Sequence, residues 1–118
     1  MSDQAVVLVV DDERYIVDLL TDLFQDEGYE VQRAYDGVAA LDVIDRRMPD
    51  LVVADVMMPR LDGLTLYNRI RERTEELPVI LMSAAVTPRS LDATFIPKPF
   101  DIDALLQLVE EKLHDRQH

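Results

Sequence analysis

The sequence predicts a single α/β domain in which helices cover both faces of a parallel sheet. Short apolar runs alternate along the chain with longer segments whose apolar residues recur at helical spacing. The joins between these segments are short, which favours consecutive strand–helix–strand units and therefore parallel strands. The chain has 118 residues, enough for one hydrophobic core and too few for two domains.

The first part of the chain reads as strand, helix and strand. Ala5–Val10 is a continuous apolar run, typical of a strand that is buried on both faces. A helix is expected from Glu13 to Glu27, and Gly28 ends it. Tyr29–Ala34 alternates apolar and polar residues, as an edge strand does. The apolar residues at helical spacing in the first helix are Ile16, Val17, Leu19, Leu20, Leu23 and Phe24.

The middle of the chain continues the alternation. Asp36–Gly37 begins a second helix, which ends before Pro49, and Leu51–Ala54 is a further buried strand. After a loop at Arg60–Gly63, a third helix is expected to end at about Arg73. The residues predicted to face the core are Val38, Leu41 and Ile44 in one helix and Leu64, Tyr67 and Ile70 in the next.

The last part of the chain supplies two strands and one helix. Pro78–Met82 reads as the fourth strand and Thr94–Pro97 as a short fifth. Asp101 is a suitable cap for the last helix, because its charge also suits the positive end of the helix dipole. The apolar residues that align along this helix are Leu105, Leu106, Val109 and Leu113.

The charge and composition exclude several classes of function. With 24 acidic and 12 basic residues the net charge is −12, which disfavours binding to nucleic acid or to anionic membranes. The absence of cysteine excludes disulfide frameworks and thiolate metal sites. The longest apolar run, Ala5–Val10, is too short to span a bilayer. It is also not preceded by a basic residue, so it does not have the pattern of a signal peptide. We expect a soluble cytoplasmic protein.

Chemically active side chains follow four of the five predicted strands. Asp11 and Asp12 follow the first strand, Asp55 the third, Ser83 the fourth and Lys98 the fifth. Because the reactive site of a doubly wound sheet lies beyond the carboxyl ends of its strands, these groups are expected to meet at one edge.

Each of these residues also has an ordinary structural interpretation. Asp12 could cap the first helix, Ser83 could be a turn residue, and Lys98 could be solvated. Together, however, the carboxylates repel one another, and crowding is expected to raise their apparent pKa as a unit unless a cation compensates. Oxygen ligands without His or Cys indicate a hard cation, Mg²⁺ before Ca²⁺. The ammonium group of Lys98 is suited to an oxyanion.

Five motifs in the same order give the chain a family resemblance. They are Asp11–Asp12, Asp55 with Met57–Pro59, Asp62–Gly63, Ser83–Ala84 and Phe95–Pro99. This set resembles the receiver domain of bacterial two-component response regulators. Each motif is weak alone, but the match covers essentially the whole chain. The resemblance implies a flavodoxin-like, five-stranded parallel sheet of order 2-1-3-4-5, with one receiver domain over residues 1–118 and no output domain in this chain.

The resemblance also implies a function. Asp55 would take a phosphoryl group from the phosphohistidine of a sensor histidine kinase or a phosphotransfer protein, and so switch a protein-interaction face. Asp12, Asp55 and the backbone carbonyl of Met57 would hold Mg²⁺, while Asp11 would act mainly through water. The domain would be a signalling domain rather than an enzyme, because it catalyses only its own phosphorylation and dephosphorylation. The sequence does not name the kinase, the pathway or the downstream target.

Three further residues acquire roles from the resemblance. Lys98 would neutralise phosphoryl charge, and Ser83 would hydrogen-bond a phosphoryl oxygen and draw its loop inward. Phe95 matches an aromatic switch position, although a plain core aromatic is an equally good interpretation. The Lys98–Pro99 peptide bond is expected to be cis, as receivers typically have it, although most X–Pro bonds are trans.

One segment departs from the family pattern. Receivers have a full helix between the fourth and fifth strands, but here only the ten residues Ala84–Ala93 lie between them. An average helix needs about 11–12 residues besides its connections, so we expect at most two helical turns and a shortened or absent fourth helix. The usual signalling face would then be altered. Val86, Leu91 and Phe95 would form a candidate partner-binding patch, unless the loop folds over its own core.

Three other functions compete with this one. A flavodoxin-like electron carrier needs a phosphate-binding loop after the first strand, where this chain has Asp11, Asp12 and Glu13. A haloacid-dehalogenase-type phosphatase resembles a D-x-D pattern, but Met57 stands two residues after Asp55. A pseudo-receiver that acts only as a docking module remains as the alternative.

Overall fold

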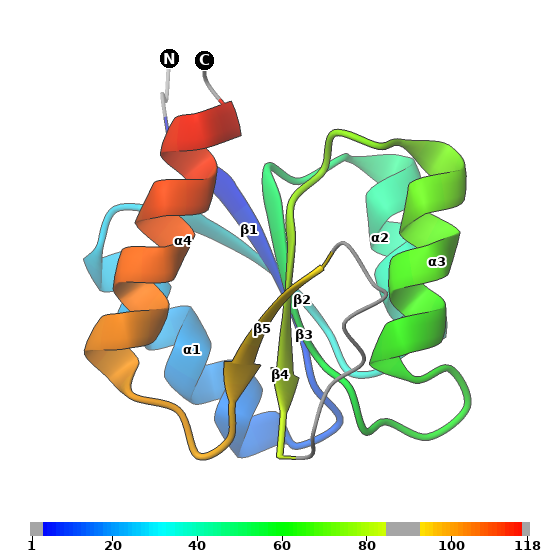
Figure 1. Cartoon of the computed structure of the whole chain (residues 1–118), viewed down its shortest axis with the longest axis horizontal. Helices are drawn as coiled ribbons and strands as arrows, with labels where there is room; N and C mark the ends of the chain where they lie inside the picture. Colours follow the sequence, from blue (N-terminus) through cyan, green and yellow to red (C-terminus); the bar gives the residue numbers. More distant parts are fainter. Residues whose placement is uncertain (1–3, 85–92, 117–118) are drawn as a thin grey trace.

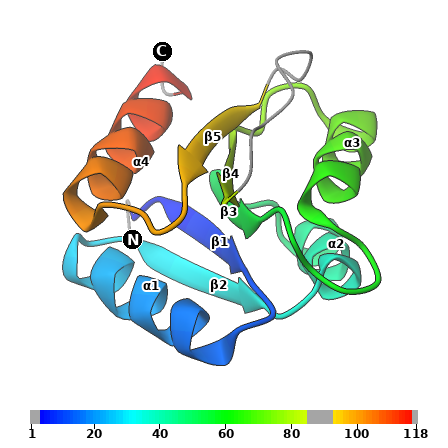
Figure 2. The ribbon, with the colours of Figure 1, turned by 60° about the horizontal axis from the view of Figure 1, so that its bottom comes forward.

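Five parallel strands pair in the order β2–β1–β3–β4–β5, which confirms the predicted sheet (Figure 1). The computed structural model describes residues 4–84 and 93–116. The strands are β1 (Val6–Val10), β2 (Glu30–Ala34), β3 (Leu51–Asp55), β4 (Val79–Ser83) and β5 (Thr94–Pro97). The helices are α1 (Arg14–Asp26), α2 (Gly37–Arg46), α3 (Gly63–Arg73) and α4 (Ile102–Arg116). Helices α1 and α4 cover one face of the sheet, and α2 and α3 cover the other (Figures 1 and 2).

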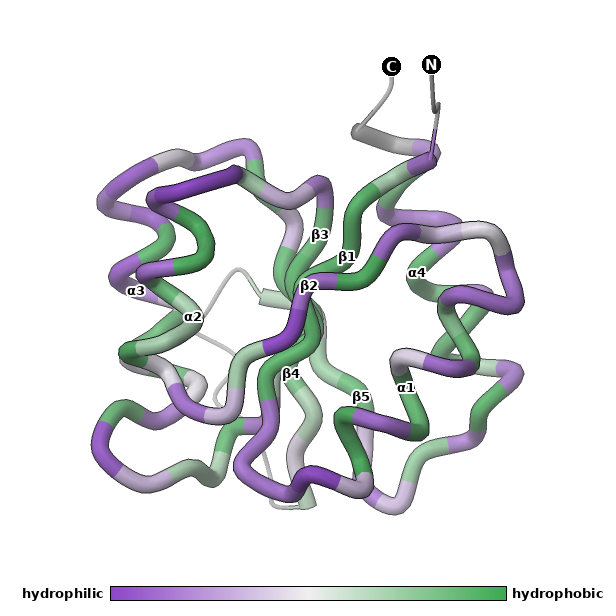
Figure 3. The backbone as a smooth tube through the Cα atoms, turned by 180° about the vertical axis from the view of Figure 1, so that it is seen from behind, coloured by the Kyte–Doolittle hydropathy of each residue, from purple (hydrophilic) through white to green (hydrophobic). Residues whose placement is uncertain are grey.

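The three central strands form the middle of two cores. Every residue of β1, β3 and β4 is buried, as their continuous apolar runs predict. Successive side chains alternate between the two faces, so that Val7 and Val9 pack in one cluster and Leu8 and Val10 in the other. Figure 3 shows the hydropathy of the chain, with hydrophobic residues along the central strands.

Aspartate side chains cap the N-termini of three of the four described helices. Asp36 accepts the Ala39 N–H at 2.7 Å at the start of α2, and Asp62 accepts the Thr65 N–H at 2.8 Å at the start of α3. Asp101 accepts the Asp103 N–H at 2.9 Å at the start of α4, as predicted. Helix α1 differs, because its N-cap, Glu13, makes no side-chain cap bond. The interpretation of Asp12 as the cap of this helix is therefore wrong.

Two apolar residues predicted to lie on buried helix faces are exposed instead. Val38 in α2 is 56% exposed, whereas Gly37, Ala40 and Ile44 are the buried residues of that helix. The first turn of α2 lies so close to Leu61 that a Cβ at Gly37 would be 2.7 Å from the Leu61 carbonyl oxygen. This approach turns Gly37 inward and Val38 outward. Leu19 in α1 is likewise 40% exposed.

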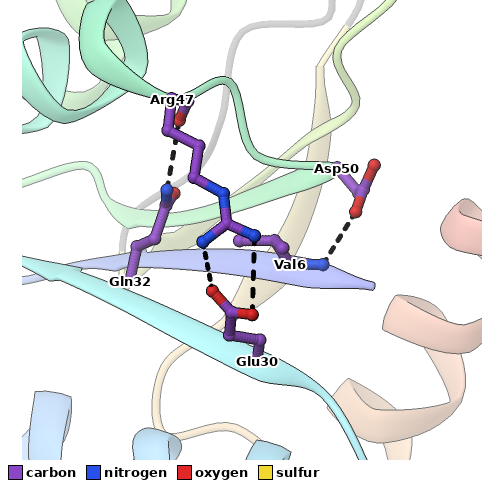
Figure 4. A network of polar contacts seen from close by, with 5 residues as sticks. All are labelled: Val6, Glu30, Gln32, Arg47 and Asp50. Carbon is purple, nitrogen blue, oxygen red and sulfur yellow. Dashed lines mark hydrogen bonds and ion pairs between the residues drawn. The ribbon is translucent and has the colours of Figure 1, made fainter. Parts of the chain in front are cut away.

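Polar contacts tie the α2–β3 connection to the amino ends of the first two strands (Figure 4). The Asp50 carboxylate accepts the Val6 N–H at 2.7 Å, and the Arg47 guanidinium forms an ion pair with Glu30. The Gln32 side-chain amide donates to the Arg47 carbonyl at 3.1 Å. The contacts of Val6 and Glu30 lie at the amino ends of β1 and β2, at the opposite edge of the sheet from the carboxyl ends that carry the candidate site.

The segment between β4 and β5 carries the predicted departure from the family. Strand β4 ends at Ser83 and β5 begins at Thr94, so ten residues separate the two strands, as predicted. The prediction of at most two helical turns between residues 84 and 93 falls mainly on residues 85–92, which lie outside the described residues, as do Val86 and Leu91 of the candidate patch. Phe95 is half-buried in β5 and packs against the cluster beneath α2 and α3. Within the described ranges, no helix is long and apolar enough to cross a membrane.

Candidate functional site

Three carboxylates meet at the carboxyl ends of β1 and β3. These strands are neighbours and run parallel, with Val10 opposite Ala54, so the residues that follow lie side by side. One ligand atom from each of Asp11, Asp12 and Asp55 lies within 4.8 Å of the others. Asp11 and Asp55 are buried, whereas Asp12 is exposed at the mouth of the site. Two of the three charges are therefore withdrawn from water.

Lys98 reaches this cluster from the end of β5. Its Nζ lies 3.0 Å from Asp55 Oδ2 and 3.3 Å from Asp11 Oδ2. The Lys98 N–H donates to the Ser83 carbonyl at 2.9 Å, which ties the ends of β4 and β5 together. The Lys98–Pro99 peptide bond is cis, as predicted. The contact with Asp11 as well as Asp55 is a detail that the sequence did not indicate.

Burial is the main cause of the altered electrostatics of the cluster. Removal from water, with a smaller contribution from the Asp55 charge, raises the pKa of Asp11 to about 6, against the opposing effects of the Glu13 N–H and Lys98. The upward direction expected from crowding is thus confirmed for Asp11, with burial as the larger cause. Burial lowers the pKa of Lys98, but the hydrogen bond to Asp55 and the charge of Asp11 outweigh it, and the net shift is upward. One ammonium group thus contacts two of the three carboxyl groups of the cluster.

We predict that Asp11→Asn stabilises the metal-free protein at neutral pH. The folded-state pKa of Asp11, about 6, exceeds its ordinary value of 3.8, so the folded state holds the proton more tightly. The wild type therefore loses stability as the pH rises from about 4 to 6, and the penalty is full above that range. The variant keeps the acceptor for the Glu13 N–H and removes the charge. We expect a gain of about 1–3 kcal/mol at pH 7.5.

Urea unfolding in EDTA at pH 4.5 and pH 7.5, followed by circular dichroism, measures this difference. Asp22→Asn, a change on exposed α1, is the control for the loss of one charge. A gain from Asp11→Asn that is equal at the two pH values would contradict the assignment of the penalty to the Asp11 carboxylate.

The remaining predicted site residues surround the cluster. Ser83 is buried at the end of β4, between β3 and β5 in the sheet. Met57 lies in the loop after β3; the residue is 73% exposed and its N–H donates to Asp55 Oδ1 at 3.3 Å. Phe95 packs against a core cluster from β5 and so has the contacts of a core aromatic. Ser83 thus lies at the end of the strand next to that of Asp55, and Met57 lies two residues after Asp55 in the chain.

Gly63 holds the backbone of Asp55, a role that the sequence analysis did not assign. A Cβ on Gly63 would lie 2.4 Å from the Asp55 carbonyl oxygen and 2.8 Å from Val56 Cα. The Gly63 N–H donates to the Val56 carbonyl at 2.9 Å and closes the loop that connects β3 to α3. The start of α3 can approach the strand only because this residue has no side chain. The Asp62–Gly63 pair was the available signal.

We predict that Gly63→Ala destabilises the domain by about 2–3 kcal/mol, because the added methyl group meets backbone that cannot move independently of Asp55. Asn68→Ala, an exposed change on the same helix, is expected to alter stability by less than about 0.5 kcal/mol. The free energy of unfolding in urea distinguishes the two. Equal stability of Gly63→Ala and the wild type would show that α3 can shift away from the strand.

The cluster has the donor set of a hard divalent cation. Its ligand atoms are carboxylate oxygens, and within the described residues it is the one group of three acidic, His or Cys side chains close enough to share an ion. Mg²⁺ prefers oxygen ligands and commonly uses one or two carboxylates together with substrate oxygens. Asp11, Asp12 and Asp55 therefore fit such an ion.

Comparison with known proteins gives one consistent result. The family model described as the response regulator receiver domain matches residues 7–110. A response regulator MprA of Mycobacterium sp. (strain KMS) is 44% identical, over 85% of this chain and 46% of that protein. The counterpart in Mycobacterium tuberculosis (strain ATCC 25177 / H37Ra) is 43% identical, with the same coverage. This chain thus spans about half the length of these relatives.

Solved structures agree with the sequence comparison. The receiver domain of NtrX from Brucella abortus has a TM-score of 0.84 and 40% identity, covering 92% of this chain and 98% of that one. The receiver domain of the hybrid histidine kinase CckA has a TM-score of 0.81 and 34% identity, covering 92% of this chain and 99% of that one.

Proposed function

Because the chain belongs to the response regulator receiver domain family, we propose that Asp55 accepts a phosphoryl group from a phosphohistidine of a partner protein. The observation that carries this proposal is the surroundings of the Asp55 carboxylate. It is buried at the end of a central strand, lies 3.0 Å from the Lys98 ammonium, and shares a cluster with two further aspartates. A buried nucleophile beside a cation and candidate metal ligands is suited to phosphoryl transfer.

In the proposed step, a carboxylate oxygen of Asp55 attacks the phosphorus atom of the phosphohistidine. The new P–O bond forms as the P–N bond breaks, and the histidine leaves as neutral imidazole, its other ring nitrogen already carrying a proton. The product is an acyl phosphate on Asp55. Lys98, already within 3.3 Å of two carboxylates, would turn to the phosphoryl oxygens and offset their charge.

Asp11, Asp12 and Asp55 would hold Mg²⁺, together with the Met57 carbonyl. When bound, the ion supplies positive charge next to the transferring phosphoryl group. The chain itself keeps two of these carboxylates out of water. Because burial and mutual repulsion both disfavour their charged forms, a bound cation would stabilise them. Asp12, exposed at the mouth, would complete the ligand set from the solvent side.

The buried Ser83 would hydrogen-bond a phosphoryl oxygen and transmit the modification. It stands at the end of β4, directly before the segment that leads to β5. A shift of that segment would change the packing of Phe95, which is half-buried on the neighbouring strand. The partner that reads this change and the histidine protein that supplies the phosphoryl group are the two proposed protein partners.

Incubation of the chain with acetyl phosphate, a small-molecule phosphoryl donor, tests the function. Intact-mass spectrometry should detect one added phosphoryl group per chain in Mg²⁺ and none when EDTA replaces the metal. A pseudo-receiver that only docks a partner would acquire no phosphoryl group in either condition. The presence of Asp11, Asp12, Asp55, Ser83 and Lys98 together favours the phosphoacceptor over this alternative.

A further inference from the structure

The loop between β3 and α3 contains a strained turn at Arg60. Within the described residues, Arg60 is the one non-glycine residue with a positive φ, at 68°. The Leu61 N–H donates to the Pro59 carbonyl at 2.8 Å, so the turn is closed across a single central residue. These two features are those of a γ-turn with positive φ, a conformation that persists only where its surroundings impose it.

Contacts with the start of α2 hold this turn. Arg60 Nη1 lies 3.4 Å from Asp36 Oδ2, while Asp36 Oδ1 accepts the Ala39 N–H. A single carboxylate thus caps α2 and pairs with the loop. The Arg60 side chain is 74% exposed, and Leu61 lies against Gly37 in the first turn of α2. The loop is therefore attached to α2 at two consecutive residues.

The same loop carries the backbone of the candidate metal site. It begins at Asp55, whose Oδ1 accepts the Met57 N–H, and it is closed by the bond from the Gly63 N–H to the Val56 carbonyl. With both ends fixed, the path of the backbone at Met57 depends on the turn at Arg60. We propose that Arg60 is a positioning residue, whose ion pair with Asp36 maintains the turn and thereby the Met57 carbonyl toward Mg²⁺; this rests on the proposed function.

Removal of the Arg60 side chain has two opposing effects on Mg²⁺ affinity, one through its charge and one through the turn. Removing a cation near an acidic cluster makes the surroundings more negative, which by itself strengthens Mg²⁺ binding. Loss of the turn acts in the opposite direction, because the apparent affinity falls with the fraction of molecules in the binding conformation. We expect Arg60→Ala to weaken Mg²⁺ binding by about three- to tenfold.

Calorimetric titration of the full chain with Mg²⁺ at fixed salt provides the measurement. Arg60→Gly also loses the ion pair, but glycine adopts a positive φ without strain, so it should bind Mg²⁺ more tightly than Arg60→Ala. Asp36→Asn keeps an acceptor for the Ala39 N–H and loses the charge, and should weaken binding by about threefold. The matched controls are Arg73→Ala and Asp45→Asn, which break an exposed ion pair between α2 and α3 away from the loop.

A second readout uses the metal-free protein. Hydrogen exchange of the Gly63 amide should be faster in Arg60→Ala than in the wild type and unchanged in Arg73→Ala, since the Gly63–Val56 bond closes the loop. Unchanged or tighter Mg²⁺ binding by Arg60→Ala would overturn the inference, and so would an equal loss in Arg73→Ala. Absence of Mg²⁺ binding to the wild type would instead refute the proposed function, and the inference with it.

Discussion

Replacement of Asp55 with asparagine is expected to abolish phosphorylation by acetyl phosphate completely. The amide has nearly the shape of the carboxylate but lacks the nucleophilic oxygen anion, so no acyl phosphate can form. The fold should persist, because the change removes one of two buried carboxylates that share the Lys98 ammonium. Intact-mass spectrometry in Mg²⁺ should find the variant unmodified under conditions in which the wild type gains one phosphoryl group.

Asp62→Asn is the matched control for this experiment. Asp62 lies in the same loop and caps α3 through its Oδ1, which accepts the Thr65 N–H, and asparagine keeps that acceptor. This variant should be phosphorylated as the wild type is. Full modification of Asp55→Asn would place the acceptor at another residue, and equal loss in both variants would indicate a damaged loop rather than a missing nucleophile.

The order of the elements and most of their bounds could be predicted because the local signals agree with the final packing. The continuous apolar runs of β1, β3 and β4 correspond to strands buried on both faces. Periodicity could not fix the rotation of α2, where a one-residue error exchanges Val38 for Gly37 on the buried face. That rotation is set by the contact between Gly37 and Leu61, two residues far apart in the sequence.

The meeting of the acidic residues also followed from the sequence, because parallel topology brings the ends of β1 and β3 together. The pairing of Lys98 with both Asp11 and Asp55 required coordinates, since a side chain's reach across a neighbouring strand has no sequence signature. The positive φ of Arg60 was unpredictable for a different reason. Arginine has no preference for that conformation. Its contact with Asp36, a residue distant in the sequence, is visible only in the folded structure.

Asp12 is the residue whose removal is expected to affect Mg²⁺ binding most. It is the exposed member of the cluster, so Asp12→Ala should leave the buried pair of Asp11 and Asp55 with Lys98 unchanged. Loss of an outer group that supports a ligand typically lowers metal affinity by about 10- to 100-fold. Loss of a direct ligand is expected to lower the affinity further. We therefore expect the Mg²⁺ dissociation constant to rise at least about 100-fold.

Calorimetry is the appropriate measurement of this loss, because the chain has no tryptophan to report binding by fluorescence. Asp18→Ala, on exposed α1, removes the same charge at a position outside the cluster, where Asp18 pairs only loosely with Arg33 at 3.8 Å. Screening by salt limits the effect of such a distant charge, so this control should change the affinity by less than about twofold. An undiminished affinity in Asp12→Ala would remove Asp12 from the ligand set, and a matching loss in Asp18→Ala would reduce its role to net charge. A loss of more than about 100-fold in Asp12→Ala alone would exceed the contribution of outer groups and so indicate a direct contact between this carboxylate and the ion.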